Sequence, residues 1–251
     1  MNPLAFVFGA GLVAGAMNAL AGGGSFVSLP ALIGVGVPSV LANASSTVAL
    51  YPGGVASVWA YRDSLSPVGA VPLRSLIIAT VLGGVVGAIL LLSTPSPTFD
   101  FVLPWLLLVA CLALAFGRKA GEWLRRRWHI APSAVLAIQF ALGIYGGYFG
   151  GAVGIMMMAV WGLIESRDLK SLNGPRTIMV SAANTMAVLT FIIAGAVRWP
   201  ETLAMLTGAI IGGYGGAHIG RRTPPHIIRV GTLLLTAGIT IAFFVRAYAR
   251  H

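Results

Sequence analysis

Apolar residues run along this chain in ten stretches, separated by short polar or glycine-rich breaks. The stretches cover residues 3–20, 25–37, 41–61, 68–92, 101–117, 133–149, 152–164, 172–196, 201–219 and 227–247. Several are long enough to span a bilayer, because ~20 helical residues at about 1.5 Å each cross the hydrocarbon core. The pattern therefore predicts an all-α polytopic membrane protein.

Two apolar regions, 3–37 and 133–164, are interrupted by glycines near their middle. The first break is Gly22-Gly23-Gly24-Ser25, and the second runs from Gly146 to Gly154. A glycine inside a helix costs about 0.8–1.0 kcal/mol relative to alanine. Unwound backbone is tolerated within a membrane only where it is buried or lines a cavity. Each break is therefore either a close packing site or a binding site.

The two breaks lie at corresponding places in two halves of the chain. A shift of 130 residues superposes three pairs of identical residues, namely Gly24 on Gly154, Asn43 on Asn173 and Thr47 on Thr177. We predict two repeats, residues 1–117 and 133–251, joined by a basic cytoplasmic linker at 118–132. Broken apolar segments at matching positions of two halves point to the binding site of a transporter.

Composition and charge narrow the class of protein. Of the 251 residues, 57% are apolar and 9% are charged, whereas a soluble domain carries about 25% charged residues. This excludes a soluble enzyme, a disordered chain and a nucleic-acid module. The net charge of +10 comes from 16 Lys and Arg against six Asp and Glu. The basic residues fall between apolar runs, so they indicate membrane topology and a lipid bilayer partner, with no nucleic acid.

The basic residues also distinguish two ways of threading the chain. If each broken region turns back as a re-entrant hairpin, 13 of the 16 basic residues lie on the side of the linker; if it crosses as one kinked helix, 10 do. The positive-inside rule favours hairpins. Each half then has a hairpin and three crossings, which makes the repeats inverted and places both termini outside. Crossing segments, which place both termini inside, remain the alternative.

The motifs of both halves resemble the TauE/SafE sulfite exporter family, also called the toluene-sulfonate uptake permease family. The first glycine motif lies in residues 15–25 and is followed by Leu29-Pro30-Ala31-Leu32. The second repeat contributes residues 146–154, Leu172-Asn173, Asn184 and residues 195–199. The second motif departs from a run of consecutive glycines, because Ala152 and Val153 precede Gly154.

The resemblance implies a multi-pass permease of the bacterial inner membrane with about eight membrane segments, four in each repeat. It implies secondary transport, without ATP, of sulfite, sulfonates, sulfoacetate or thiosulfate. An anion channel with the same site, and small carboxylates or phosphonates as substrates, remain alternatives. We expect no enzyme activity and no cofactor, since the sequence has no Walker motif, metal cluster or nucleophile motif. Coupling to H⁺, to Na⁺ or to no ion stays open, as does a homodimer.

A small anion needs hydrogen-bond donors and positive potential, which the N-termini of half-helices near Ser25 and Ile155 offer. Ser25 adds a hydroxyl donor, unless it caps its own helix. Arg176, an intramembrane arginine, could hold an oxyanion bidentately, unless it snorkels or pairs with Glu165 or Asp168. A wider polar set includes Ser45 and Ser181, for which interhelical hydrogen bonding is the alternative. The predicted substrate ligands are Asn18, Gly22, Gly23, Gly24, Ser25, Asn43, Ser46, Thr47, Gly150, Gly151, Gly154, Asn173, Arg176, Thr177 and Asn184.

Overall fold

The structure is a computed structural model that describes residues 2–60, 62, 71–125, 131–151, 153–164, 172–220 and 222–248. Within these ranges the chain is all-helical, which confirms the predicted fold class. The helices are α1 (Pro3–Ala21), α2 (Ser25–Gly34), α3 (Ser39–Ala60), α4 (Leu73–Ser93), α5 (Ser96–Arg125), α6 (Pro132–Phe149), α7 (Val153–Ile164), α8 (Asn173–Ile193), α9 (Trp199–Gly220) and α10 (Pro225–Tyr248).

Each helix falls on one of the ten apolar stretches, and one boundary differs clearly. The apolar pattern ends α5 at residue 117, but the helix continues to Arg125 through part of the predicted linker. The added residues include Lys, Ala, Glu, Leu and Arg, which are good helix formers, so polarity alone does not mark a loop there.

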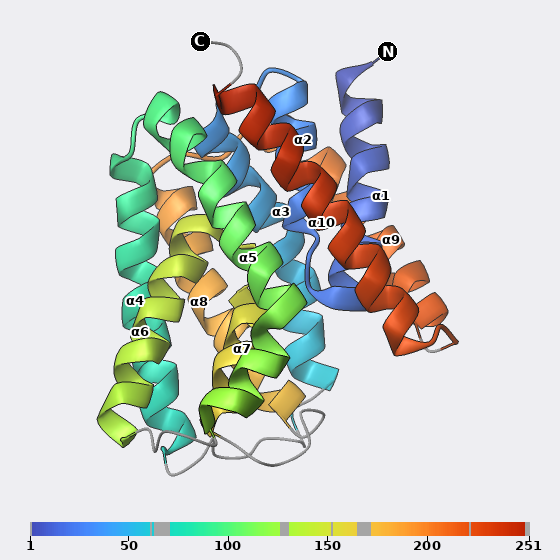
Figure 1. Ribbon diagram of the computed structural model, residues 1–251. Helices are drawn as coiled ribbons and strands as arrows, with labels where there is room; N and C mark the ends of the chain where they lie inside the picture. The colour runs from blue at the N-terminus through green and yellow to red at the C-terminus, as the bar shows by residue number, and fades with distance from the viewer. Residues whose placement is uncertain are drawn as a thin grey trace.

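Six helical segments of the described chain are long and apolar enough to cross a membrane. They are Pro3–Ala21, Leu73–Ser93, Ser96–Gly117, Pro132–Phe149, Gly174–Ile193 and His226–Tyr248. The protein is therefore a multi-pass membrane protein. Helices α3 and α9 have 22 residues each and lie beside these spans in Figure 1.

The two short helices turn back along the helices that precede them (Figure 1). α2 packs against α1, and α7 packs against α6. The large side chains of Phe26 on α2 and Trp161 on α7 are fully buried, so both short helices lie inside the bundle. We call α1–α2 the first hairpin and α6–α7 the second hairpin. The start of α1 and the end of α10 lie at the same end of the bundle (Figure 1).

Glycines allow two pairs of long helices to pack closely. α1 lies along α9, where a methyl group at Gly15 would overlap the backbone of Ala209, and one at Gly212 would overlap Leu12. α4 lies along α6 in the same way, with Gly87 against the carbonyl of Ile144. Small residues bring helix backbones into such contact in membranes. In each seam the residue numbers rise together, so the paired helices run parallel.

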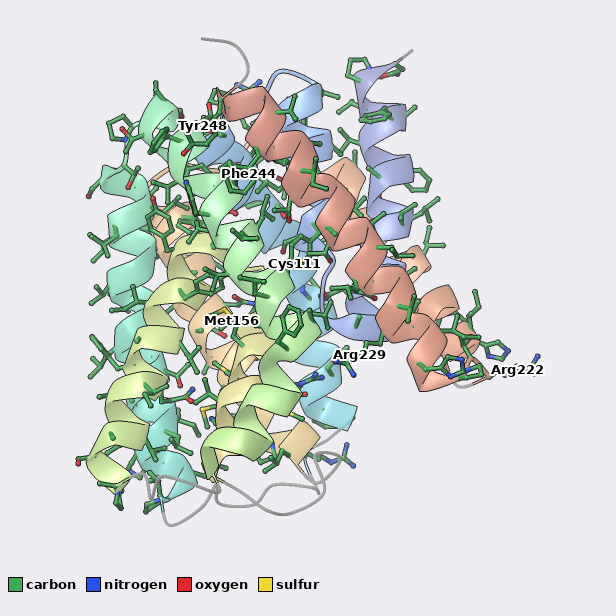
Figure 2. All side chains as sticks on the ribbon, viewed as in Figure 1. Cys111, Met156, Arg222, Arg229, Phe244 and Tyr248 are labelled. Atoms are coloured by element: carbon green, nitrogen blue, oxygen red, sulfur yellow. The ribbon has the colours of Figure 1, made fainter. Side chains whose placement is uncertain are left out.

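Two further pairs of helices run antiparallel, namely α3 with α8 and α5 with α10. Between α3 and α8, the hydroxyl groups of Tyr51 and Thr185 are 2.7 Å apart. Further along α3, a Cβ atom at Gly54 would lie 3.3 Å from Ser181 Oγ, so residue numbers rise on α3 as they fall on α8. Between α5 and α10, the Trp105 Nε1 donates to the Tyr248 hydroxyl at 2.8 Å, and Arg229, near the other end of α10 (Figure 2), donates to the Ala115 carbonyl at 3.1 Å.

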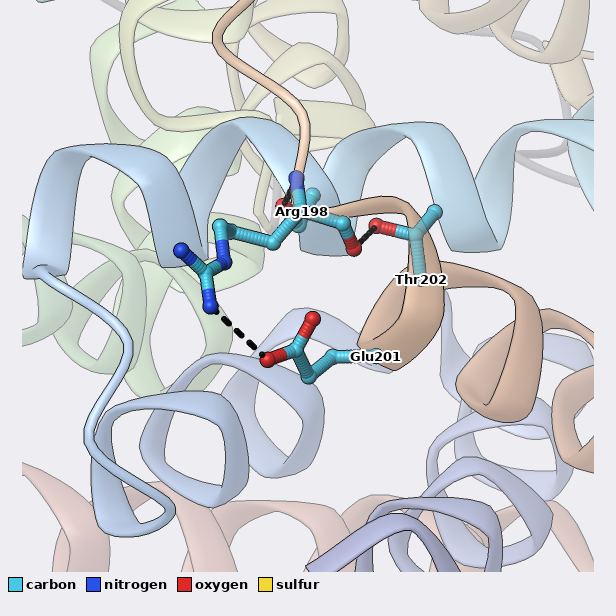
Figure 3. A network of polar contacts seen from close by, with 4 residues as sticks. Arg198, Glu201 and Thr202 are labelled. Atoms are coloured by element: carbon cyan, nitrogen blue, oxygen red, sulfur yellow. Dashed lines mark hydrogen bonds and ion pairs between the residues drawn. The ribbon is translucent and has the colours of Figure 1, made fainter.

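The connection from α8 to α9 is tied to α3 by a small polar network (Figure 3). The Arg198 backbone N–H donates to Ser45 Oγ at 2.9 Å, and Thr202 Oγ1 donates to the Arg198 carbonyl at 2.7 Å. The Arg198 guanidinium lies 3.4 Å from a Glu201 carboxylate oxygen. These contacts fix the start of α9 against the first half of α3.

Candidate functional site

A cavity of about 160 Å³ lies where the turns of the two hairpins meet α3 and α8. All four of these elements contribute residues to its wall. The cavity therefore lies at the two glycine breaks, between the two halves of the chain.

The first hairpin turns because Gly22 ends α1 in the left-handed region, with φ at 74°. Its N–H donates to the Asn18 carbonyl at 2.9 Å. The N-cap of α2 is Gly24, which offers no side chain, and Ser25 is the first helical residue. The hydroxyl of Ser25 is therefore not the cap of α2, and Ser25 lines the cavity. The N–H groups of Phe26 and Val27 donate to the carbonyls of Gly23 and Gly24 at 3.1 and 3.0 Å, so the first turn of α2 closes on the backbone of the hairpin turn.

The second hairpin turns in the same manner at Gly150, whose φ is 71° and whose N–H donates to the Gly146 carbonyl at 2.7 Å. Thr47 of α3 packs directly on this turn. At Gly154, in the first turn of α7, a Cβ atom would lie 3.6 Å from Cδ of Arg176. The aliphatic part of Arg176 therefore lies beside the first turn of α7.

α8 supplies the polar side of the cavity through Arg176, Thr177, Ser181 and Asn184. Arg176 brings a positive charge, and no carboxylate is found among the described residues of the wall. Ser181 is 7% exposed. Its Oγ and the Asn184 Oδ1 are buried with no hydrogen-bond partner in the described part of the chain. A buried polar atom without a partner costs about 1–3 kcal/mol, so these atoms indicate a place for a ligand.

The structure brings together nine of the predicted ligands from four separate elements. Those lining the cavity are Asn18, Gly22, Ser25, Thr47, Gly150, Gly154, Arg176, Thr177 and Asn184. The side chain of Asn173 lies outside the described residues. Five predicted ligands, Gly23, Gly24, Asn43, Ser46 and Gly151, do not line the cavity.

Those five residues have packing or hydrogen-bonding surroundings of their own. The Asn43 side-chain amide donates to the Tyr148 carbonyl at 2.9 Å, which joins α3 to the end of α6. Ser46 Oγ is 2.5 Å from Ser28 Oγ, which joins α3 to α2. Gly24 packs against Asn18, and Gly151 packs against Phe149. These polar groups are therefore used in holding the hairpins, as interhelical hydrogen bonds are elsewhere in membranes.

The cavity wall also contains residues that were not predicted as ligands, namely Ala19, Ala21, Leu50, Gly54, Ser57, Val153, Val180 and Ser181. A sequence signal existed for Ser181, which lies one helical turn after Thr177 and three residues before Asn184, on the same helix face. A similar spacing relates Thr47, Leu50, Gly54 and Ser57 on α3. The apolar members carry no signal that separates them from ordinary packing residues.

Comparisons with known proteins agree over nearly the whole chain. A family model described as "Sulfite exporter TauE/SafE" matches residues 7–243. A "Probable membrane transporter protein" of Haemophilus influenzae is 27% identical over 241 residues, which cover 94% of this chain and 92% of that protein. The "Probable membrane transporter protein YfcA" of Escherichia coli K12 is 28% identical, over 93% of this chain and 87% of the relative. No solved structure gives a significant match.

Proposed function

This chain belongs to the sulfite exporter TauE/SafE family of membrane transporters, and we propose that it carries a small sulfur oxyanion or sulfonate across the cell inner membrane. Sulfite, sulfonates, sulfoacetate and thiosulfate are the substrates that the family resemblance favours. The observation that carries this proposal is the cavity at the two hairpin turns, where Arg176 and two helix N-termini converge.

The cavity has the chemistry of an anion site. The N-termini of α2 and α7 bring the positive ends of their helix dipoles to the cavity, through Ser25 and Val153 in its wall. Arg176 adds a guanidinium that can donate two parallel hydrogen bonds to one oxyanion. Hydroxyl groups of Ser25 and Thr177 offer further donors. The volume of about 160 Å³ holds several waters, because a water needs about 10–15 Å³ of such volume, and this suits a small anion.

The arrangement of helices supports alternating access between two inverted repeats. Counterpart helices α3 and α8 run antiparallel, as do α5 and α10. The seam of α1 with α9 has its counterpart in the seam of α6 with α4. An exchange of the halves therefore maps these contacts onto one another about an axis in the plane of the membrane, with the cavity near that axis. In this topology the hairpins are re-entrant, both termini are outside and the basic linker is cytoplasmic.

The first test is ligand binding by the purified protein in detergent. We expect one sulfur anion among sulfite, thiosulfate, sulfoacetate and taurine to raise the melting temperature, while acetate and phosphate do not. A ligand at 100 times its Kd stabilises the folded state by about 2.7 kcal/mol. The shift should disappear in Arg176→Ala and return in part in Arg176→Lys, which keeps the charge but not the paired donors.

Two results would redirect the proposal. Stabilisation by acetate or by a phosphonate, and by none of the sulfur anions, would assign the site to carboxylates or phosphonates instead. Flux measurements in proteoliposomes separate a transporter from a channel. Internal substrate should accelerate uptake of labelled substrate by exchange, and unchanged uptake with a linear current would indicate a channel.

A further inference from the structure

Two buried oxygen atoms without partners belong to residues of the cavity wall that come after Arg176 on α8. Ser181 Oγ and Asn184 Oδ1 lie on the same face of α8, one turn apart, and both are buried without a partner in the described chain. Gly54 of α3 faces Ser181, since a Cβ atom there would lie 3.3 Å from Ser181 Oγ. Asn18 of α1 lines the same cavity, and its Nδ2 lies 3.7 Å from the Cβ position of the neighbouring Gly53. α8 therefore brings two side-chain oxygens to a place that α1 and α3 enclose.

The C-terminus of α1 adds backbone carbonyls to this part of the cavity. The Gly22 N–H donates to the Asn18 carbonyl. The carbonyls after Asn18 belong to the last turn of α1, where an α-helix has no further N–H groups to pair with them. Ala19 and Ala21, which follow Asn18, line the cavity. The last turn of a helix carries partial negative charge. The first hairpin thus presents a negative helix end and a positive helix end to the same cavity.

The kinds of oxygen atom in this part of the cavity indicate which cation it would bind. Ca²⁺ and Mg²⁺ sites use carboxylates, and none is found in the described wall. A transported proton needs a titratable carrier, and the described wall has no Asp, Glu or His. Neutral hydroxyl, amide and carbonyl oxygens at the C-terminal end of a broken helix are the ligands that hold Na⁺ in secondary transporters.

We propose that one Na⁺ binds between the end of α1, Gly54 of α3 and the Ser181–Asn184 face of α8, and is transported together with the anion. This inference rests on the proposed anion transport, because it assigns the coupling ion to the same cavity. Entry of an anion is opposed by a membrane potential that is negative inside. A Na⁺ moving with a monovalent anion removes that opposition, so the site assigns the protein to uptake.

The first experiment measures Na⁺ binding without any sulfur anion. The full-length protein in detergent is melted in NaCl, KCl and choline chloride of equal concentration, so that chloride and ionic strength stay constant. We expect a saturable rise of the melting temperature in NaCl alone. The double variant Ser181→Ala/Asn184→Ala should weaken the Na⁺ midpoint at least tenfold.

Ser93→Ala is the matched control, because Ser93 donates to the Ile89 carbonyl at 2.9 Å on α4 and does not line the cavity. It should keep the Na⁺ midpoint of the unaltered protein. The single variant Ser181→Ala removes one oxygen and guards against loss of folding in the double variant. Equal midpoints in Ser181→Ala and the unaltered protein would overturn the site.

Other outcomes separate this inference from the proposed function. If Na⁺ raises the melting temperature but none of the anions does, the cation site is supported and the proposed substrate is wrong. An anion shift that is the same in NaCl and choline chloride, with no Na⁺ shift, overturns the cation site and keeps the anion site. A third outcome would also overturn the cation site: taurine raises the melting temperature, Ser181→Ala removes this rise, and Na⁺ causes none. The oxygens of α8 would then bind the ammonium group of the substrate.

Discussion

The two hairpins reach the same cavity through turns that each begin at a glycine with positive φ, but they are held in the bundle differently. The second hairpin is fastened by a chain of buried hydrogen bonds through three helices. Trp161 Nε1 of α7 donates to Gln139 Oε1 of α6 at 3.0 Å, and Gln139 Nε2 donates to Thr80 Oγ1 of α4 at 2.7 Å. Thr80 Oγ1 in turn donates to the Leu76 carbonyl at 2.7 Å. Each polar atom of this chain has a partner.

The first hairpin depends mainly on apolar packing. Phe26, Leu29 and Leu32 of α2 are buried in the largest apolar cluster of the described chain. A single side-chain bond, between Ser28 and Ser46, joins α2 to α3. The span of α1 is 22% buried inside the protein, against 39% for that of α6.

This difference in anchoring predicts that the two hairpins, although similar in shape, have different roles in transport. Hydrogen bonds have a narrow range of geometry, so the Gln139 chain fixes α7 against α4 and α6. Apolar contacts are not directional, so α1 and α2 can shift with less loss. We expect the second hairpin to act as the fixed wall of the cavity and the first hairpin to move when access changes.

The largest effects should come from the helix seams, where the two halves are alike. Gly15→Val would place a side chain on the Ala209 backbone, and Gly87→Val would place one on the Ile144 backbone. Backbone cannot move aside as a side chain does, and overpacking of a close contact costs about 1–3 kcal/mol or more. We expect neither variant to yield monodisperse protein in detergent by size-exclusion chromatography.

Gly9→Val is the control for these seam variants, because no atom lies within 4 Å of its Cβ position. It should be produced like the unaltered protein. If Gly15→Val yields monodisperse protein and Gly87→Val does not, the two seams also differ. The seam of α1 with α9 would then tolerate a larger side chain than the seam of α4 with α6.

The sequence was sufficient to predict the helices and the place of the candidate cavity, but not which residues line that cavity. Ten apolar stretches predicted the ten described helices, and the glycine breaks predicted where the chain turns and where the cavity lies. On a helix, successive side chains point about 100° apart, so neighbouring polar residues face different neighbours. Ser46 therefore meets Ser28, whereas Thr47 meets the cavity. Which face of a helix lies toward the cavity depends on how helices from both halves of the chain pack around it.

The next largest effect should follow from breaking the Gln139 chain. Gln139→Met keeps the volume but leaves the Trp161 N–H without its acceptor. A buried donor left unpaired costs about 1–3 kcal/mol in soluble proteins, and interhelical bonds in membranes average ~0.6 kcal/mol. We expect a fall of the melting temperature by several degrees in detergent. Ser28→Ala, the matched change in the first hairpin, should lower it less, and an equal or larger fall would contradict the proposed difference in anchoring.

Hydrogen–deuterium exchange tests the same difference without any substitution. Local opening free energies set the exchange of backbone amides. We expect amides of α2 to exchange at least about tenfold faster than those of α7, which corresponds to ~1.4 kcal/mol in opening free energy. Saturating substrate should slow α2 more than α7. Slower exchange in α2 than in α7 would reverse the assignment of the moving hairpin.

The smallest and sharpest comparison is between the turn glycines themselves. Gly22→Ala and Gly150→Ala both put a side chain at a positive φ, which costs about 1–2 kcal/mol. At Gly22 the new methyl group meets no atom within 4 Å, whereas at Gly150 it would lie 2.7 Å from Thr47 Oγ1. Gly150→Ala should therefore lower the melting temperature further than Gly22→Ala. Adding Thr47→Ala to Gly150→Ala removes the hydroxyl that the new methyl group would meet. The melting temperature of this double variant should then lie below that of Thr47→Ala alone by no more than Gly22→Ala lowers the melting temperature of the unaltered protein. If the double variant recovers nothing, the second turn is constrained by more than its contact with α3.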